Sequence, residues 1–430
     1  MLQPQRPVRM DSGRFEDLPR IARRFLAYAE MDTASDPSSG ASPSTRRQLA
    51  FAQILAIELR EAGAEDVRVS NAGVVTATLP ASPGAEDRPV MGLLAHMDTS
   101  PEAPSDRILP RVADFTGEPL RLDEAGERVL SIETHPELAR HRGERLIVTD
   151  GRTLLGADDK AGVAVLVELA AHLADRPETP HAKIRLAFTP DEEIGRGTDH
   201  LPLEEFGADY AYTFDGGEVG ELETENFHAA EARIVFRGVN THPGAAKGRM
   251  KNALRMAGDF IGSLPKKESP EETEGRDGFY HPTRIEGSVA EAQLELIIRD
   301  FDRPSFEARK RAVMALAEAL NEVHGEGSVT ADVRDQYANM KEGLEAFGPV
   351  VELAREALRR AGLELREPPV RGGTDGAMLT AKGLPTPNLF AGGLYFHSVF
   401  ECLPIPSLEA AFAAALELAR GSAELKTVRG

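Results

Sequence analysis

Short apolar runs that alternate with helical segments are the feature that most restricts the fold of this chain. The runs VRVS, VVTATLP, VMGLLAHMD and AKIRLAFTP have the length and residue types of strands, and a helix is expected to begin near Lys160. Strands that alternate with helices indicate an α/β layer with a largely parallel sheet. Residues that follow such strands meet at one edge of the sheet, where ligands and catalytic groups lie.

The pattern changes near Glu225, which suggests a second domain. Residues 226–337 read as strand, helix, strand, strand, helix and strand, the order of a ferredoxin-like α+β unit. We expect this segment to be an inserted domain, with residues 1–225 and 338–430 forming the other domain. The length of 430 residues agrees with two or three domains. A Ser- and Pro-rich loop ends at Thr45, which we expect to cap the next helix.

Charge and cysteine content narrow the possible partners and compartments. Lys and Arg number 50 against 70 Asp and Glu, a net charge of −20, so nucleic acid and anionic membranes are not expected as partners. The single Cys402 cannot form an internal disulfide, which favours the cytoplasm. Residues 1–15 contain no apolar stretch typical of a secretory signal, and Val163–Ala174 is too short to span a membrane.

Five short segments place His, Asp or Glu beside apolar, strand-like residues. In LLAHMDTSPEAPS, His96 and Asp98 follow an apolar run and point to the same side of a strand. Such a pair is either a solvated strand end or a metal-binding imidazole that a carboxylate orients. In TLLGADDKAG, Asp158 and Asp159 precede an apolar helix, where one aspartate is sufficient for capping.

The other three segments are equally ambiguous when each is taken alone. The segment FTPDEEIG contains Asp191, Glu192 and Glu193. These residues form either a solvated acidic turn or a site in which one glutamate binds metal and the other transfers protons. Asp215 of YTFDGGE could belong to an ordinary Asp-Gly turn. His397 of YFHSVFE could be a packed core residue.

Together the five segments favour a two-metal hydrolase. Two imidazoles with several carboxylates form a mixed N/O set that suits zinc or a related divalent ion rather than calcium. The sequence contains no Cys-rich cluster, phosphate-binding G-x-x-x-x-G-K-[ST] loop or G-x-S-x-G elbow. Structural zinc, P-loop and serine-hydrolase interpretations therefore have no support.

Nearly the whole chain resembles the peptidase T family, the tripeptide aminopeptidases of the dizinc exopeptidases. The blocks that carry the resemblance are, in order, RFLAYAEMDTAS, HMDTSPEAPS, TLLGADDKAG, FTPDEEIGRG, FDGGEVGELETENF, THPGAAKGRMKNAL, IIRDFDRPSFEARK, RGGTDGAMLTAKGLPTPNLFAGG and FHSVFE. The resemblance implies a catalytic domain with a mixed, largely parallel sheet flanked by helices. It also implies that the inserted ferredoxin-like domain serves as a lid and dimerisation domain.

The resemblance also implies roles for individual residues. His96 and Asp215 would bind one Zn²⁺, Glu193 and His397 the second, and Asp158 would bridge both, with Co²⁺ or Mn²⁺ as substitutes. Asp98 would orient His96, and Glu192 would be the general base. The peptide bond after the bridging aspartate is cis in this family.

Substrate contacts and assembly follow from the same resemblance. His242 would reach the active site of a partner subunit in a homodimer, and Arg299, with Arg371 as a weaker candidate, would anchor the carboxylate of a short peptide. Without the resemblance these residues would be interpreted as a satisfied loop histidine and solvated arginines. Ser398 stands where this family is expected to have glycine, which puts strict tripeptide selectivity in doubt. The alternatives are a dizinc hydrolase of N-acyl amino acids or dipeptides and a binding protein that has lost catalysis.

Overall fold

The computed structural model describes residues 16–430, which divide into two compact units. The first comprises Met1–Thr224, Gly343–Pro368 and Thr374–Gly430, as far as these are described, and the second comprises Glu225–Glu342 and Pro369–Gly373. The expectation about a secretory signal concerns residues 1–15 and lies outside the described residues. Among residues 16–430, no helix combines the length and apolarity needed to cross a bilayer.

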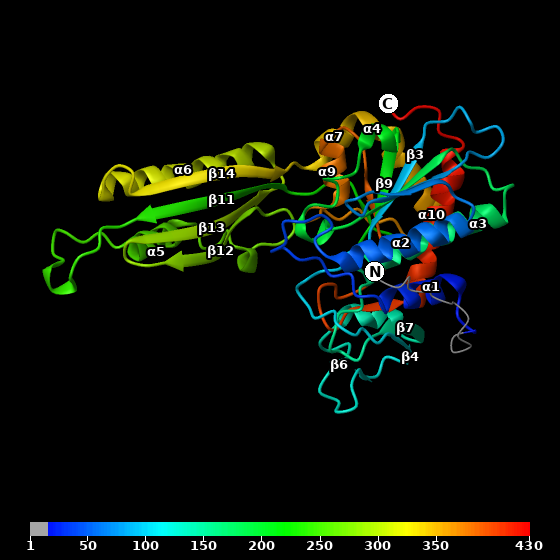
Figure 1. The fold of residues 1–430 in the computed structure, drawn as a ribbon, viewed down its shortest axis with the longest axis horizontal. Helices are drawn as coiled ribbons and strands as arrows, with labels where there is room; N and C mark the ends of the chain where they lie inside the picture. Colours follow the sequence, from blue (N-terminus) through cyan, green and yellow to red (C-terminus); the bar gives the residue numbers. More distant parts are fainter. Residues whose placement is uncertain (1–15) are drawn as a thin grey trace. The chain divides into compact units, whose positions relative to one another are not determined.

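The first unit is built on a seven-stranded sheet (Figure 1). Its strand order is β1 (Glu65–Val69), β2 (Val75–Leu79), β8 (Ile184–Thr189), β3 (Met91–His96), β9 (Tyr210–Phe214), β15 (Asn388–Leu389) and β10 (Leu222–Glu223). The pairs β8–β3, β3–β9 and β9–β15 are parallel, whereas β1–β2, β2–β8 and β15–β10 are antiparallel. The predicted mixed sheet is confirmed, with its parallel pairs confined to the centre.

Helices cover both faces of this sheet. Those of the first unit are α1 (Arg20–Ala29), α2 (Arg46–Glu61), α3 (Ala157–Asp175), α4 (Leu203–Phe206), α8 (Gly348–Arg360), α9 (Asp375–Ala381) and α10 (Ile405–Ser422), and α7 (Met340–Leu344) contains the boundary between the units. Phe206 of α4 and Leu379 of α9 pack with Leu94 in one apolar cluster. Helix α3 lies against β3 and β9, and a side chain at Gly162 would collide with the Phe214 carbonyl oxygen. Glycine therefore permits α3 to approach β9 closely.

Two small sheets complete the first unit. One consists of β16 (Cys402–Pro404), β7 (Glu144–Val148) and β4 (Arg111–Phe115), and the other of β5 (Leu120–Arg121) and β6 (Val129–Leu130). Strand β16 follows His397 and Glu401 directly in the chain, and its pairing with β7 fixes the end of that loop. Thr45 stands at the N-cap of α2, but its hydroxyl donates to the Ala34 carbonyl at 3.0 Å and bonds no helix N–H group. The predicted cap interaction is therefore wrong.

The second unit has the predicted β-α-β-β-α-β order. Its sheet is antiparallel, in the order β12 (Phe279–Gly287), β13 (Glu291–Asp300), β11 (His228–Arg237) and β14 (Val329–Tyr337), and its helices are α5 (Ala253–Ser263) and α6 (Arg303–His324). Both helices pack on the same face, because each contacts β11 and β13 and they touch each other. Strand β13 alternates buried and more exposed residues, as expected for a sheet covered on one side.

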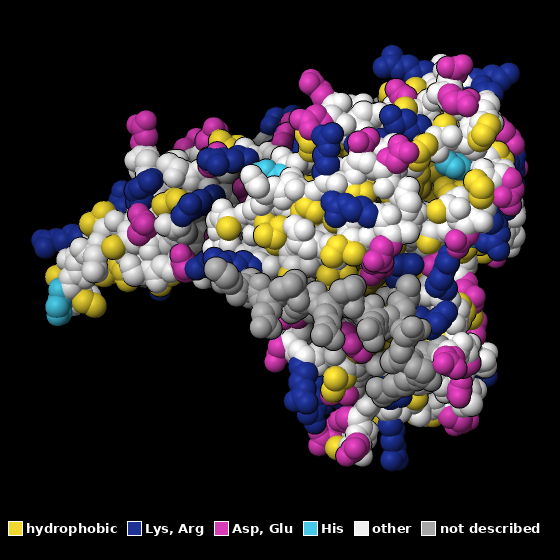
Figure 2. All heavy atoms as spheres, turned by 45° about the vertical axis from the view of Figure 1, so that its right-hand side comes forward, with side chains coloured by type: hydrophobic (Ala, Val, Ile, Leu, Met, Phe, Trp, Pro, Cys, Tyr) yellow, Lys and Arg dark blue, Asp and Glu magenta, His cyan; other side chains and the backbone are white. Residues whose placement is uncertain are grey.

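Charged side chains of both signs are spread over the surface in view (Figure 2). On the face that Figure 2 shows, Lys and Arg side chains are interspersed with Asp and Glu and do not gather into one basic area. A protein that holds nucleic acid usually presents a basic stripe or patch. This face therefore offers no such surface.

A buried ionic cluster joins three helices of the first unit, and we expect it to be important for stability. Arg24 of α1 pairs with Glu58 of α2 and with Glu168 of α3, and its side chain is 6% exposed. Replacing Arg24 by methionine should lower the free energy of unfolding by about 3–5 kcal/mol, because Glu58 loses its ion-pair partner and the buried Glu168 keeps only the more exposed Arg20. Arg20→Met is the control, since Arg20 also pairs with Glu168 but is 38% exposed, and should cost about 1 kcal/mol or less. Denaturant unfolding of both variants checks this, and equal losses would contradict it.

Candidate metal centre

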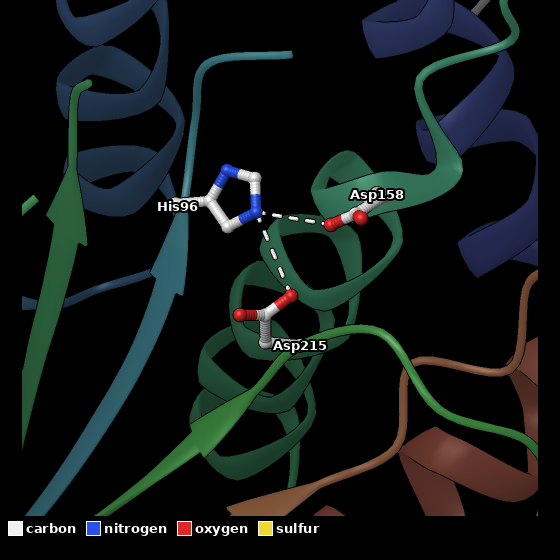
Figure 3. Close-up of side chains that lie close together, drawn as sticks. All are labelled: His96, Asp158 and Asp215. Carbon is white, nitrogen blue, oxygen red and sulfur yellow. Dashed lines mark hydrogen bonds and ion pairs between the residues drawn. The ribbon is translucent and has the colours of Figure 1, made fainter. Parts of the chain in front are cut away.

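The first group of candidate ligands lies at the carboxyl edge of the seven-stranded sheet (Figure 3). His96 is the last residue of β3, Asp215 follows β9, and Asp158 lies at the start of α3. The His96 Nε2 atom lies 3.0 Å from Asp158 Oδ1 and 3.5 Å from Asp215 Oδ1. Parallel β3 and β9 bring the two strand-end residues together, and the approach of α3 adds the third.

A second group shares Asp158 with the first. The His397 Nε2 atom lies 2.9 Å from Glu193 Oε2 and 3.5 Å from Asp158 Oδ2. Within each group of three residues, one potential ligand atom per residue lies within 4.8 Å of the others, a spacing that could hold a metal ion. The two oxygens of Asp158 thus face different histidines, as a bridging carboxylate requires.

Asp98 joins the first histidine to the acidic turn after β8. The His96 Nδ1 atom lies 3.1 Å from the Asp98 carbonyl oxygen and 3.3 Å from Asp98 Oδ1. The same carboxylate accepts hydrogen bonds from the backbone N–H groups of Glu192 at 3.0 Å and Glu193 at 3.2 Å. Asp98 is fully buried, so these contacts hold both the imidazole ring and the two glutamates in fixed directions.

The two adjacent aspartates at the start of α3 have different partners. Asp159 accepts from the Gly162 N–H at 3.1 Å, inside the first turn of the helix, and from the His96 N–H at 3.1 Å. Asp158 instead faces His96 and His397. The peptide bond between the two aspartates is cis, as the resemblance implied. Asp159 therefore caps the helix, whereas Asp158 has the position of a candidate metal ligand.

Glu401 supports the segment that carries Asp158. Its buried carboxylate accepts three backbone N–H groups, those of Leu155 at 2.8 Å, Gly156 at 2.7 Å and Asp158 at 3.0 Å. Burial raises the pKa of Glu401 to about 7, although these hydrogen bonds oppose the rise. The sequence identified Glu401 as part of the last block but gave it no role.

Replacing Glu401 by glutamine should weaken metal binding about 10–100-fold, the usual cost of losing a group that orients a ligand. The amide would direct its own N–H groups at backbone N–H donors, and the Asp158 segment would lose its anchor. Glu409→Gln is the matched control, because Glu409 is exposed on α10. Chelator competition with zinc measures both affinities, and an unchanged affinity in Glu401→Gln would contradict this role.

The site concentrates negative charge in a buried place. Burial, together with the charges of Asp215, Asp375 and Glu193, raises the pKa of Glu192 well above its ordinary value, against the opposing effect of His96. Burial and Asp158 raise the pKa of Glu193 to about 7, and hydrogen bonds with Asp158 and Glu193 raise that of His397 to about 11. Carboxylates that lie close together repel one another, and a cation bound between them relieves this repulsion.

The donor set fits a pair of divalent ions. Each group offers one imidazole nitrogen and two carboxylates, the ligand types typical of zinc and similar metals. In addition, the Oε1 atom of Glu193 is buried and has no hydrogen-bond partner. A buried oxygen without a donor is costly unless something else satisfies it, and a cation would do so.

The three predicted substrate contacts all lie in the second unit. His242 is exposed and accepts from the Gly244 N–H at 3.1 Å. Arg299 donates to the carbonyls of Ala230 and Ile298 and lies over the Tyr337 ring. Arg371 donates to carbonyl oxygens of the loop at residues 273–277 and stacks on two phenylalanine rings. Both arginines thus have structural partners within their own unit.

Glu102 and Asp375 lie near the centre but carry no signal in the sequence, unlike Ser398, which the sequence marked as a departure from the family pattern. Glu102, 70% exposed, places its Oε2 atom 3.2 Å from His397 Nδ1, so each candidate histidine has an acidic residue beside its second nitrogen. Asp375 is buried and accepts from the Thr189 hydroxyl at 2.7 Å. Ser398 donates to the Tyr395 carbonyl at 2.7 Å, so its hydroxyl closes the turn that carries His397.

Comparison with known proteins identifies the class. Residues 147–421 match the model of "Peptidase family M20/M25/M40". A protein named Peptidase T from Geobacillus sp. (strain WCH70) is 47% identical over 389 residues, which cover 90% of this chain and 95% of that protein. A protein of the same name from Parabacteroides distasonis is 48% identical, with the same two coverages. The chain therefore belongs to peptidase family M20/M25/M40.

Solved structures share the fold across almost the whole chain. A tripeptidase from Staphylococcus aureus subsp. aureus mu50 aligns with a TM-score of 0.75 at 22% identity, covering 94% of this chain and 98% of that one. The aminopeptidase PepT from Bacillus cereus ATCC 10987 aligns with a TM-score of 0.74 at 24% identity and the same coverage. The resemblance and the fold class predicted from the sequence are thereby confirmed.

Proposed function

We propose that this chain is a metal-dependent aminopeptidase that releases the N-terminal residue from tripeptides. The observation that carries the proposal is the pair of three-residue groups that share Asp158, with Glu192 on the adjoining turn. Relatives 47% and 48% identical over 90% of the chain are named Peptidase T, which supports the tripeptide substrate. The lone Cys402, which is buried and free, is consistent with work in the cytoplasm.

The proposed centre binds two Zn²⁺ ions, with Co²⁺ or Mn²⁺ able to substitute. His96 and Asp215 would hold one ion, Glu193 and His397 would hold the other, and Asp158, which belongs to both groups, would contribute to each. When bound, two such ions activate water near neutral pH and polarise the scissile carbonyl. Asp98 and Glu401 keep the ligands in place through the hydrogen bonds described above.

Glu192 is the proposed proton carrier. Its backbone is held by Asp98 on the turn that also carries Glu193, which places a carboxyl group beside the candidate ligands, where it can accept a proton and later give it up. It takes a proton from the attacking water and transfers it to the nitrogen of the departing amine, so the C–N bond breaks with release of a neutral amine. Glu193, one residue further on, is held toward His397 and keeps its separate role as a ligand.

Substrate recognition and assembly are part of the same proposal. On the resemblance to the peptidase T family, His242 reaches the active site of the second subunit in a homodimer. Arg299, and less strongly Arg371, anchors the carboxylate of the peptide. The carbonyl groups that hold both guanidinium groups limit their freedom, which suits a fixed anchor.

Hydrolysis of matched substrates tests the proposal. A free tripeptide, its N-acetylated analogue and the corresponding dipeptide should each be offered to zinc-loaded and chelator-treated protein. We expect zinc-dependent release of the N-terminal residue from the free tripeptide only. Preference for the acetylated peptide or the dipeptide would instead indicate a hydrolase of N-acyl amino acids or dipeptides, and failure to cleave any substrate would contradict catalysis.

A further inference from the structure

A buried polar cluster lies immediately before the acidic turn. Asp191 is fully buried and adopts a left-handed backbone conformation, with φ of 62°. Its Oδ2 atom accepts from the Ser44 N–H at 2.7 Å, and its Oδ1 atom accepts from the Ser44 hydroxyl at 2.5 Å and from Gln48 Nε2 at 2.7 Å. Three donors thus surround this carboxylate, and all three belong to Ser44 and Gln48 rather than to a candidate metal ligand.

The cluster also binds the backbone of Asp191. The Asp191 N–H donates to Gln48 Oε1 at 3.1 Å, so the amide of Gln48 forms a reciprocal pair with one residue. Gln48 is fully buried in the first turn of α2, and Ser44 lies just before that helix. A non-glycine residue at positive φ costs about 1–2 kcal/mol, and these hydrogen bonds stabilise it.

The next residue along the chain is Glu192. Asp98 holds the N–H groups of Glu192 and Glu193 from one side, while Ser44 and Gln48 hold Asp191 from the other. Asp191 directly precedes the short helical turn Glu192–Ile194 that follows β8, so its backbone conformation sets the direction in which this turn begins. A change of conformation at Asp191 would therefore move the carboxylate of Glu192.

We propose that Ser44, Gln48 and Asp191 are positioning residues that fix the direction of the Glu192 carboxylate. The proposal rests on the proposed function, in which Glu192 transfers the proton. A group that acts through Glu192 should affect turnover and leave substrate affinity and zinc affinity nearly unchanged, because none of the three residues is a candidate ligand.

Exchanging the two polar groups provides the test. Asp191→Asn places an amide N–H against the donors of Ser44 and Gln48, and Gln48→Glu places a second carboxylate against Asp191. Each single variant should lower kcat about 10–100-fold, with KM and zinc affinity within about twofold of the parent. In the double variant the new amide can donate to the new carboxylate, so kcat should recover to within about fivefold of the parent. Zinc affinity by chelator competition and Tm are measured for all three variants.

The outcomes separate the two proposals. Recovery of kcat in the double variant supports the positioning role. If the losses of kcat in the two single variants instead add in the double variant, the positioning role is overturned. A large fall in zinc affinity or Tm that accounts for the lost activity would also overturn it, because it would assign the cluster to folding alone. If the cluster acts through Glu192, the variant that combines Asp191→Asn with Glu192→Gln should have the same kcat as Glu192→Gln alone. If Glu192→Gln alone is fully active, the proton-transfer role itself fails, independently of the exchange.

Discussion

Replacing Glu192 by glutamine is expected to lower kcat about 10²–10⁴-fold while both zinc ions remain bound. Glutamine has the shape of glutamate but cannot accept the proton of the attacking water. The metal-binding groups do not include Glu192, so zinc content should not change. Steady-state hydrolysis of a tripeptide and metal analysis of the same sample check the two halves of this result.

Glu204→Gln is the matched control for this prediction, because Glu204 is exposed on α4. It should retain the activity of the parent. Retained activity in Glu192→Gln would remove the proposed base. A loss of zinc together with activity would place Glu192 among the ligands.

Replacing Asp158 by alanine is expected to remove both ions, the largest effect of any single change. Asp158 is the only residue common to the two groups of candidate ligands found in residues 16–430. Zinc stabilises the folded parent because it binds the native site, by about 4 kcal/mol at a thousandfold excess over Kd. In Asp158→Ala, added zinc should no longer raise Tm, and both bound zinc ions should be lost.

Asp175→Ala is the control for the second prediction, since Asp175 lies on the same helix and its side chain is 59% exposed. Added zinc should raise the Tm of this variant as it does that of the parent. If zinc raised the Tm of Asp158→Ala equally, the shared aspartate would have no role in binding. Thermal unfolding with and without zinc provides the comparison.

Among the predicted site residues, those that follow strands are the ones whose proximity the sequence pattern itself indicates. His96 ends β3 and Asp215 follows β9, and the topology of a parallel pair brings such residues to one edge. His397 differs, because it lies on a loop with φ of 57° and follows no strand of the large sheet. For His397 only the resemblance indicated a ligand position.

Adjacent residues of the same type could not be separated by pattern. Asp158 and Asp159 both precede a helix, and only the course of the backbone shows that Asp159 binds the helix N–H group. Likewise, the sheet is antiparallel at both edges. At one edge β1 and β2 form a hairpin, and at the other the short β10 pairs with β15 from a distant part of the chain, and neither arrangement follows from an alternation of strands and helices.

Long-range polar contacts were beyond the reach of the sequence. Gln48 and Asp191 are 143 residues apart, and a single glutamine on a helix has no periodicity that indicates a buried partner. The same reason applies to Glu102 and His397, which are 295 residues apart. Residues 369–373 join the second unit through the bridge between Asn226 and Val370, a segment too short to show a strand pattern.

The most direct test of the central claim is anomalous X-ray diffraction from crystals of the zinc-loaded protein, recorded at the zinc absorption edge. We expect two peaks per chain, one beside His96 and Asp215 and the other beside Glu193 and His397, with Asp158 next to both. A single peak, or peaks bound by other residues, would contradict a two-metal centre built on a shared aspartate.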